Sequence, residues 1–153
     1  MKIMFICTGN ICRSAMAEGM MKKLVKEENI DAEIFSCGIY AETGDYATYN
    51  AIEAVKDYEV DITSHRATNI RVSKIKEMDL ILCATVSHKQ SVLYLYPELK
   101  EKVYTMKEYA DICKDGQDLD IKDPWGYDLN VYNHCASEIK ECLDKTVEKI
   151  KAK

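Results

Sequence analysis

The sequence predicts an α/β fold: a single doubly wound domain in which a four-stranded parallel sheet carries helices on both faces, as in flavodoxin-like proteins. Two observations support this prediction. Short apolar segments alternate along the chain with longer segments in which apolar residues recur at helical spacing. The chain has 153 residues, the size of one domain, and 47% hydrophobic residues can supply one core. Without any visible linker, repeat or low-complexity segment, we expect one domain over residues 1–153.

Four segments are expected as strands. The first, Lys2–Cys7, is an almost continuous apolar run, which is typical of a strand buried on both faces. The second, Glu33–Cys37, is stopped by Gly38, and the remaining two are Leu80–Cys83 and Lys102–Thr105. Because parallel strands need long crossover connections, which are right-handed, the segments between them are expected to be helical.

The helical segments show apolar residues three or four positions apart. This spacing predicts helices over Arg13–Glu28, Ala47–Asp57 and Ser87–Tyr96. A last amphipathic helix is expected near the C-terminus, where the periodic apolar residues are Ile139, Leu143, Val147 and Ile150.

Charge and cysteine content narrow the class of protein. The 26 acidic residues outnumber the 21 basic ones and give a net charge of −5, which argues against a nucleic-acid-binding protein and against docking on an anionic membrane. The N-terminal apolar run is too short for a signal peptide, and no segment is long enough to span a bilayer. The seven cysteines are scattered without framework spacing, so we expect a cytoplasmic protein with reduced thiols.

The most informative segment is CTGNICRS, residues 7–14. Cys7 ends the first expected strand, and Arg13 stands where a helix is expected to begin. A loop of this length can turn its backbone N–H groups inward, and the helix N-terminus adds partial positive charge. Gly9 permits a sharp turn, and Asn10 tolerates a left-handed backbone. The pattern therefore predicts a phosphate cradle.

The chemistry of this segment indicates a nucleophile. Arg13 can hold two phosphate oxygens, and the same positive field favours the thiolate form of Cys7, which can attack phosphorus. Ser14 can donate a hydrogen bond to the sulfur. Asp123, in the loop expected at Asp115–Pro124, is a candidate proton donor for the leaving group. The alternatives are a buried strand-end thiol beside an unrelated surface arginine, and an ordinary Asp-Pro turn.

Together the segment at residues 7–14, Ala17-Glu18 in the following helix and Asp123-Pro-Trp resemble the low-molecular-weight protein tyrosine phosphatases. The resemblance covers essentially the whole chain, and Gly126 after the Asp-Pro-Trp segment is similar to the bacterial-type branch. It implies hydrolysis of protein phosphotyrosine and small aryl phosphates through a phosphocysteine intermediate. The implied partner is a phosphotyrosine-containing protein or a small phosphomonoester, the product is inorganic phosphate, and neither a cofactor nor a metal ion is needed.

The resemblance also implies roles for individual residues. Cys7 matches the nucleophile, and Arg13 matches the arginine that binds phosphate and stabilises the transition state. Asp123 matches the general acid, which then acts as general base for the hydrolytic water. The phosphate-binding loop implied by the match consists of Thr8, Gly9, Asn10, Ile11, Cys12, Arg13 and Ser14.

Four further matches concern the support of this loop. Ser14 matches the serine that tunes the thiolate, and Asn10 matches the asparagine that holds the shape of the loop. Glu18 and His65 match residues that brace it; the alternative for His65 is a surface loop histidine. The resemblance further implies that Cys12 can form a reversible disulfide with the nucleophile, a pattern typical of redox-sensitive sites.

Substrate choice depends on the mouth of the pocket. Arginine phosphatases that resemble this chain carry Thr at the position of Ile11, where a hydroxyl suits a polar guanidinium. The branched apolar side chain of Ile11 favours contact with a phenyl ring, and Tyr40 and Trp125 could form the pocket walls. We therefore expect a preference for phosphotyrosine.

Other functions remain open at this point. A protein arginine phosphatase would use the same mechanism on another substrate. An arsenate reductase shares the fold and the first loop, but needs further cysteines to relay a disulfide, and Cys83 has no partner cysteine a few residues on. A phospho-carrier domain would have little use for Arg13 and a distal Asp-Pro acid. A non-enzymatic phosphate-binding module would not need the intact set of Cys7, Arg13 and Asp123.

Overall fold

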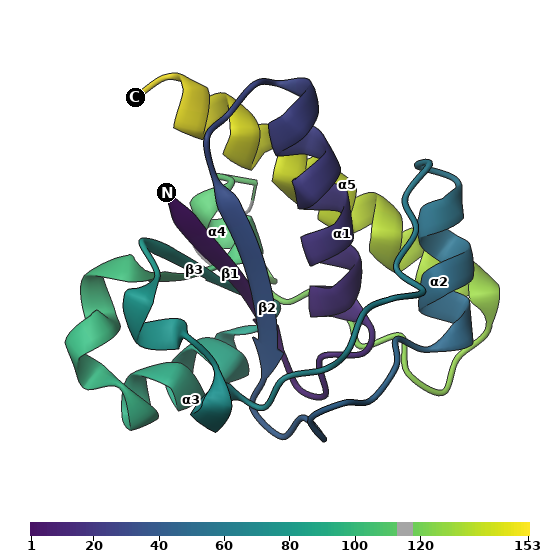
Figure 1. Cartoon of the computed structure of the whole chain (residues 1–153), viewed down its shortest axis with the longest axis horizontal. Coiled ribbons are helices and arrows are strands. Elements are labelled where there is room, and N and C mark those ends of the chain that lie inside the picture. Colours follow the sequence, from purple (N-terminus) through teal and green to yellow (C-terminus); the bar gives the residue numbers. More distant parts are fainter. Residues whose placement is uncertain (113–117) are drawn as a thin grey trace.

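The central sheet is built from β1 (Lys2–Cys7), β2 (Glu33–Gly38), β3 (Leu80–Cys83) and β4 (Val103–Thr105) in the computed structural model of the chain (Figure 1). All neighbouring strands are parallel, in the order β2-β1-β3-β4. The structure describes residues 1–112 and 118–153. The order confirms the predicted doubly wound sheet. The point at which the strand order reverses lies between β1 and β3, where such folds bind ligands.

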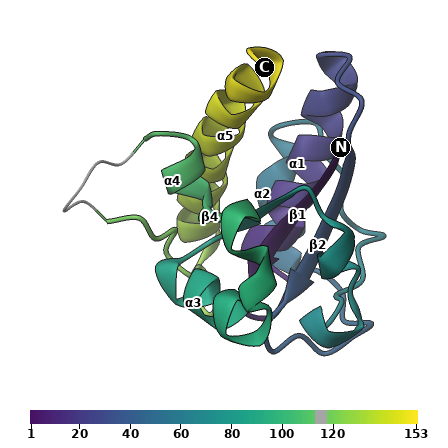
Figure 2. The same ribbon diagram turned by 90° about the vertical axis from the view of Figure 1, so that its left-hand side faces the viewer.

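Within residues 1–112 and 118–153, five α-helices surround the sheet (Figure 2). On one face α1 and α5 pack against the strands, with α2 and α4 beside α5; on the other face lies α3 together with three short 3₁₀ turns. The helices are α1 (Arg13–Glu27), α2 (Tyr49–Lys56), α3 (Val86–Leu95), α4 (Met106–Tyr109) and α5 (Leu129–Lys151). The 3₁₀ turns are Ile70–Val72, Ile75–Glu77 and Pro97–Lys102.

The side chains of β1 explain why its sequence is continuously apolar. Ile3 and Phe5 pack into the cluster formed with α1 and α5, whereas Met4 and Ile6 pack into the cluster formed with α3. All of them are at most 1% exposed. Full burial of one such side chain stabilises a fold by roughly 1.5–3 kcal/mol, so this central strand anchors both layers.

Several element boundaries differ from the predicted ones by one or two residues, and capping explains the difference. Thr48 accepts a hydrogen bond from the backbone of Ala51, so α2 begins after it and not at Ala47. Thr85 accepts from the backbone N–H of His88, so α3 begins one residue before the expected start. Threonine is favoured at such N-cap positions because its hydroxyl satisfies a free N–H group of the first turn.

The sequence prediction missed α4. Thr105 and Glu108 form a capping box at its start, a signal that is present in the sequence but in a helix of one turn. The last helix is longer than its periodic apolar residues indicate, and Asp128 caps its first turn. Of the loop predicted at Asp115–Pro124, residues 118–124 contain neither helix nor strand, and residues 115–117 lie outside the described residues.

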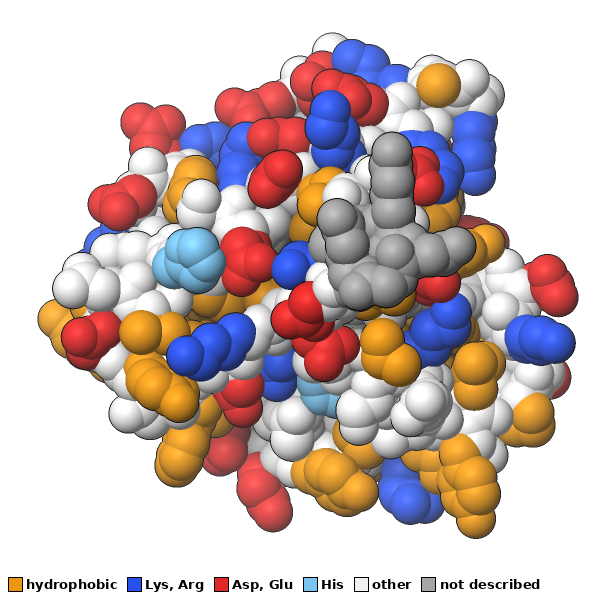
Figure 3. Space-filling model, turned by 180° about the vertical axis from the view of Figure 1, so that it is seen from behind, with side chains coloured by type: hydrophobic (Ala, Val, Ile, Leu, Met, Phe, Trp, Pro, Cys, Tyr) orange, Lys and Arg blue, Asp and Glu red, His pale blue; other side chains and the backbone are white. Residues whose placement is uncertain are grey.

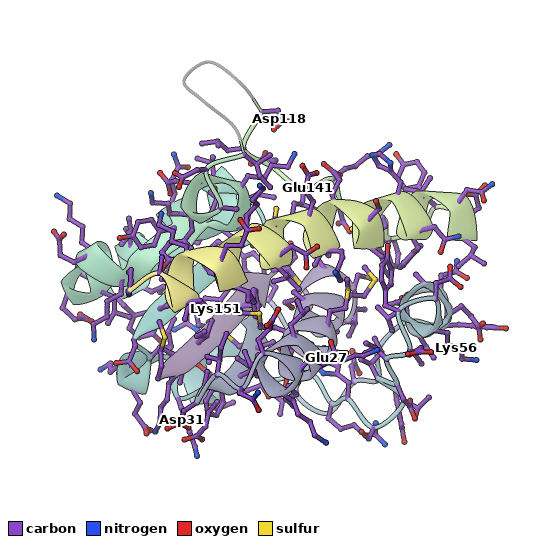
Figure 4. All side chains as sticks on the ribbon, turned by 90° about the horizontal axis from the view of Figure 1, so that it is seen from above. Glu27, Asp31, Lys56, Asp118, Glu141 and Lys151 are labelled. Carbon is purple, nitrogen blue, oxygen red and sulfur yellow. The ribbon has the colours of Figure 1, made fainter. Side chains whose placement is uncertain are left out.

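Charged side chains project from the surface, whereas the sulfur atoms lie among the helices and strands (Figure 4). On the face shown in Figure 3 acidic and basic side chains are interspersed. The described cysteines are all buried; Cys113 lies outside the described residues. Within residues 1–112 and 118–153, no helix is long and apolar enough to cross a membrane.

Gly38 lets the β1–α1 loop approach the end of β2. It pairs with Cys7 across the sheet, and its N–H donates to the carbonyl of Thr68. A Cβ at this position would lie 2.5 Å from the carbonyl oxygen of Thr8 and 2.9 Å from the backbone nitrogen of Asn10. Because both atoms belong to the backbone, neither can move aside without distorting the loop.

We expect Gly38→Ala to lower the free energy of unfolding by roughly 1–3 kcal/mol, the usual cost of overpacking. Urea denaturation monitored by circular dichroism measures this cost. Gly9→Ala is the matched control, because its Cβ would meet only side-chain atoms of Ile11, at 3.5 and 3.8 Å. Equal losses of stability in the two variants would contradict the steric argument.

Candidate active site

The β1–α1 loop lies at the carboxyl edge of the sheet, at the lower end of Figure 1. It forms one side of a pocket of about 270 Å³, and the segment that follows residue 120 forms the other. Residues far apart in the sequence therefore meet there. The residues that line this pocket, hereafter the catalytic pocket, are Cys7, Thr8, Gly9, Ile11, Cys12, Arg13, Asp123 and Trp125.

A chain of hydrogen bonds ends on the sulfur of Cys7. The Ser14 hydroxyl oxygen lies 2.8 Å from Cys7 Sγ and accepts a hydrogen bond of 2.8 Å from Asn10 Nδ2. Since Ser14 accepts from the amide, its own proton is available for the sulfur. A hydrogen bond of this kind stabilises a thiolate, which matches the role expected for Ser14.

Asn10 connects the loop to the rest of the fold. It is fully buried with φ of 57°, the left-handed conformation that asparagine tolerates. Its side-chain oxygen accepts from the backbone N–H of Thr68 at 2.9 Å, and its side-chain nitrogen also donates to Ser36 at 2.9 Å. Its backbone carbonyl accepts from His65 Nε2 at 2.7 Å.

Glu18 and His65 contact this arrangement from behind, and their roles in bracing the loop stay a prediction. Ser36 accepts from Asn10 and donates in turn to Glu18 Oε1. Lys22 Nζ lies 2.7 Å from Glu18 Oε2, and His65 Nδ1 lies 3.7 Å from Glu18 Oε1. Ser36 belongs to a segment that shares the family resemblance but was not predicted as a site residue, although its position near the end of the strand beside β1 could have identified it.

Arg13 is almost completely buried beneath the pocket, with 4% of its surface exposed. Its Nη1 donates to the carbonyl of Ile121 at 2.8 Å, and its Nη2 lies 3.7 Å from Asp123 Oδ2. Its buried Nε has no hydrogen-bond partner among the described residues. A buried guanidinium N–H without a partner is costly, so an anion in the pocket would stabilise this group.

Asp123 lies in a segment fixed at both sides. Ile121 is fully buried and Pro124 is buried, whereas the Asp123 side chain is 55% exposed at the pocket. The backbone N–H of Trp125 donates to Asp123 Oδ1 at 3.1 Å, which orients the carboxylate. The carboxyl group can therefore exchange protons with solvent while it stays close to Arg13.

Cys12 also lines the pocket, but its thiol is held differently from that of Cys7. Its sulfur lies 3.3 Å from the Tyr132 hydroxyl and 3.6 Å from the Thr48 hydroxyl. Burial raises the pKa of the Cys12 thiol, so this residue stays protonated near neutral pH. The Cys7–Cys12 disulfide stays a prediction.

Of the three residues predicted to determine substrate specificity, two line the catalytic pocket and one does not. Ile11 and Trp125 line the catalytic pocket, and Trp125 is 64% exposed. Tyr40 does not line it; the Tyr40 side chain is 78% exposed and borders a neighbouring hollow on α3. The structure therefore does not bring Tyr40 together with Cys7, and its role in specificity stays a prediction.

His88 contacts the loop from α3 and was not predicted as a site residue. Its Nε2 lies 2.8 Å from Thr8 Oγ1, and its Nδ1 lies 2.9 Å from Thr85 Oγ1. Burial, together with the positive charge of Arg13, lowers the pKa of His88 from 6.5 to about 4. The sequence offered one signal for this contact. Thr85 is a favourable helix cap three residues before His88, so the two side chains are expected to lie close together.

The lowered pKa of His88 predicts that the stability of the fold depends on pH. The fold favours the neutral imidazole, so the contribution to stability is fully present above pH 6.5 and is lost as the pH falls toward 4. In this window the free energy of unfolding should fall with a slope approaching about 1.4 kcal/mol per pH unit from this group. We expect His88→Gln to flatten the slope in urea denaturation, whereas His134→Gln, on the exposed face of α5, should keep it. An unchanged slope in His88→Gln would contradict the assignment.

The chain is similar to known proteins over nearly its whole length. The family described as low molecular weight phosphotyrosine protein phosphatase matches residues 2–153. A protein-arginine-phosphatase of Bacillus subtilis is 31% identical, over 99% of this chain and 97% of its own length. A low molecular weight protein-tyrosine-phosphatase of Staphylococcus epidermidis is 30% identical, over 95% of this chain and 96% of its own.

A solved structure supports the same assignment. The low molecular weight protein tyrosine phosphatase from T. tengcongensis is 40% identical and superposes with a TM-score of 0.89, covering 97% of this chain and 99% of that one. These matches confirm the resemblance seen in the sequence. The chain belongs to the low molecular weight phosphotyrosine protein phosphatase family and is a phosphatase.

Proposed function

We propose that the chain hydrolyses phosphotyrosine in proteins, and small aryl phosphates, through a phosphocysteine intermediate on Cys7. The observation that carries this proposal is the convergence of Cys7, Arg13 and Asp123 in one pocket with the apolar side chains of Ile11 and Trp125. The three polar residues supply a nucleophile, an anion-binding group and a proton donor.

In the first step the Cys7 thiolate attacks phosphorus, an S–P bond forms and the P–O bond to the phenol breaks. Arg13 binds the phosphoryl oxygens, and its unpartnered Nε gains an acceptor. Asp123 donates its proton to the leaving phenolate oxygen, which departs as the neutral phenol. The 55% exposure of the Asp123 side chain supports this role, because the leaving group must reach it from the open side of the pocket.

In the second step water attacks the phosphocysteine and releases inorganic phosphate. Asp123, now a carboxylate, takes a proton from the water while the S–P bond breaks. The sulfur leaves as a thiolate, and the Ser14 hydroxyl at 2.8 Å stabilises it by a hydrogen bond. Asn10 keeps Ser14 in this orientation: the Asn10 amide donates a hydrogen bond to the serine oxygen, so the serine proton points to the sulfur.

The walls of the pocket support phosphotyrosine as the substrate. Ile11 and Trp125 provide apolar surface at its mouth, where an aromatic ring can pack. A phosphoserine side chain is shorter and lacks the ring, so it would neither fill this mouth nor extend as far toward Cys7.

A second candidate substrate is protein phosphoarginine. It is favoured by the similarity to the Bacillus subtilis protein-arginine-phosphatase. The nucleophile, the arginine and the acid would keep their roles, and the P–N bond would break in place of the P–O bond. The apolar side chain of Ile11 argues against it, since it offers a guanidinium no hydrogen-bond partner.

Removal of the acid tests the mechanism. We expect Asp123→Ala to slow formation of the phosphoenzyme by about 10²–10⁴-fold for aryl phosphates with poor leaving groups, and far less for good ones. Asp123→Asn keeps the shape of the side chain but has no acidic proton, so it should lose as much. Pre-steady-state kinetics over a series of substituted phenyl phosphates measure this dependence. A loss independent of the leaving group would remove Asp123 from the role of general acid.

A substrate panel tests the specificity. We expect turnover of phosphotyrosine peptides to exceed that of the corresponding phosphoarginine and phosphoserine peptides, with chelator present and with Cys7→Ser as the inactive control. Ile11→Thr should shift the preference toward phosphoarginine, whereas Ile11→Val, which has the same shape without the hydroxyl, should not. Preference of the natural protein for phosphoarginine would retain the mechanism and contradict the substrate.

A further inference from the structure

A second hollow lies beside the catalytic pocket, between α3, the segment that follows β2 and the 3₁₀ turn Ile70–Val72. Its volume is about 460 Å³. Two exposed aromatic rings border it, Tyr40 and Tyr94, which are 78% and 88% exposed. The polar side chains on its walls are Arg71, Ser87, Gln90 and Ser91.

Backbone hydrogen bonds place this hollow directly next to the catalytic loop. The N–H of Ile39 donates to the carbonyl of Cys7 at 3.0 Å, and the N–H of Tyr40 donates to the carbonyl of Thr8 at 2.9 Å. From the other side, His88 of α3 contacts the Thr8 hydroxyl. Thr8 therefore lies between the catalytic pocket, which it lines, and the walls of the hollow.

Arg71 differs from the other arginines of the chain. Arg13 pairs with Ile121 and Asp123, and Arg66 donates to two backbone carbonyls and lies 3.7 Å above the ring centre of Tyr46. The guanidinium of Arg71 has no hydrogen bond, ion pair or ring contact with any residue that the structure describes.

The position of Arg71 is nevertheless fixed by its backbone. Its N–H donates to Asn69 Oδ1 at 2.9 Å, and the neighbouring Ile70 is 1% exposed. Asn69 Nδ2 donates to the carbonyl of Ala41 at 2.9 Å, which attaches the turn to the segment of Tyr40. The backbone thus fixes where the Arg71 side chain starts, at the rim of the hollow, whereas ordering the side chain itself on a ligand still costs rotamer entropy.

The remaining polar groups of the hollow also suit an anion. The side chains of Ser87, Gln90 and Ser91 can donate hydrogen bonds and have no partner within residues 1–112 and 118–153. Of the described residues that line the hollow, none is acidic, although acids outnumber bases in the chain. The carboxylate near the start of α3, Asp120, accepts from the backbone of Val86.

We propose that this hollow binds an acidic side chain of the phosphoprotein substrate, close in sequence to the phosphorylated residue, with Arg71 as the group that recognises the carboxylate. The inference rests on the proposed function and adds the sequence preference of its substrate. An extended peptide advances by about 3.3–3.6 Å per residue, so a residue a few positions from the phosphoamino acid can cross Thr8 and enter the hollow. Tyr40 and Tyr94 then pack against the peptide from both sides.

Peptide series test this proposal. The series consists of phosphotyrosine peptides with Glu, Gln or Lys placed at successive positions on both sides of the phosphorylated residue. The value of kcat/KM is measured for each peptide. We expect Glu to exceed Gln by about threefold to fivefold at one or two neighbouring positions, as suits one solvent-exposed ion pair. Arg71→Gln should abolish the preference, Arg71→Lys should retain part of it, and Arg71→Glu should reverse it in favour of Lys.

Lys26→Gln, which removes the same charge near the far end of α1, is the matched control and should keep the preference. Equal kcat/KM values across the series, or a preference that survives in Arg71→Gln, would overturn the proposal. If the preference instead reflected only the overall charge of the protein, the removal of one positive charge would weaken it equally in Arg71→Gln and Lys26→Gln, and that result would also contradict the proposal.

The test separates this inference from the proposed function. Turnover of a small aryl phosphate depends on the catalytic pocket alone and therefore measures the proposed chemistry. Binding of the same phosphopeptides to Cys7→Ser, measured by fluorescence anisotropy, reports on the hollow without any turnover. Equal affinity for the Glu, Gln and Lys peptides in that assay would overturn the Arg71 proposal even if the enzyme acted on another phosphoamino acid.

Discussion

The left-handed turn at Asn10 is the constraint on which the site depends. The Asn10 side chain and carbonyl connect the loop to Ser14, Ser36, Thr68 and His65 at once, and all of this takes place in a fully buried position. Buried polar groups of this kind are stable only when every one of them is satisfied. The loop therefore has one shape, in which the sulfur of Cys7, the Ser14 hydroxyl and the start of α1 are fixed relative to one another.

The sheet provides the place for this loop, and the loop's own sequence provides the chemistry. Parallel strands bring their carboxyl ends to one edge, and β1 is the central strand at which the direction of strand addition changes. The close contact with Gly38 holds the loop against β2, while His88 holds it from α3. Arg13 and Asp123 then meet across the pocket at 3.7 Å, although they lie at opposite ends of the sequence.

Much of this arrangement could be predicted from the sequence. The apolar run of β1 and the residue types at positions 7–14 indicate a buried strand followed by a phosphate loop, and the resemblance adds Asp123. Caps of short helices and tertiary contacts are harder to predict. The helix α4 is only one turn long. His88, which Thr85 orients, contacts the loop through Thr8, and Thr8 is far away in the sequence. Tyr40 shows the same limit, because the position of a residue in the sequence does not tell which of two adjacent hollows its side chain borders.

Turnover is expected to pass through a phosphoryl group on Cys7. The most direct test is to quench the enzyme during steady-state turnover of an aryl phosphate and to locate the phosphoryl group by mass spectrometry. We expect phosphocysteine at Cys7 in the natural protein. With a substrate that has a good leaving group, Asp123→Ala should accumulate more of it, because hydrolysis of the intermediate then lacks its base. Turnover without any phosphorylated Cys7, or a phosphoryl group on another residue such as His88, would contradict this expectation.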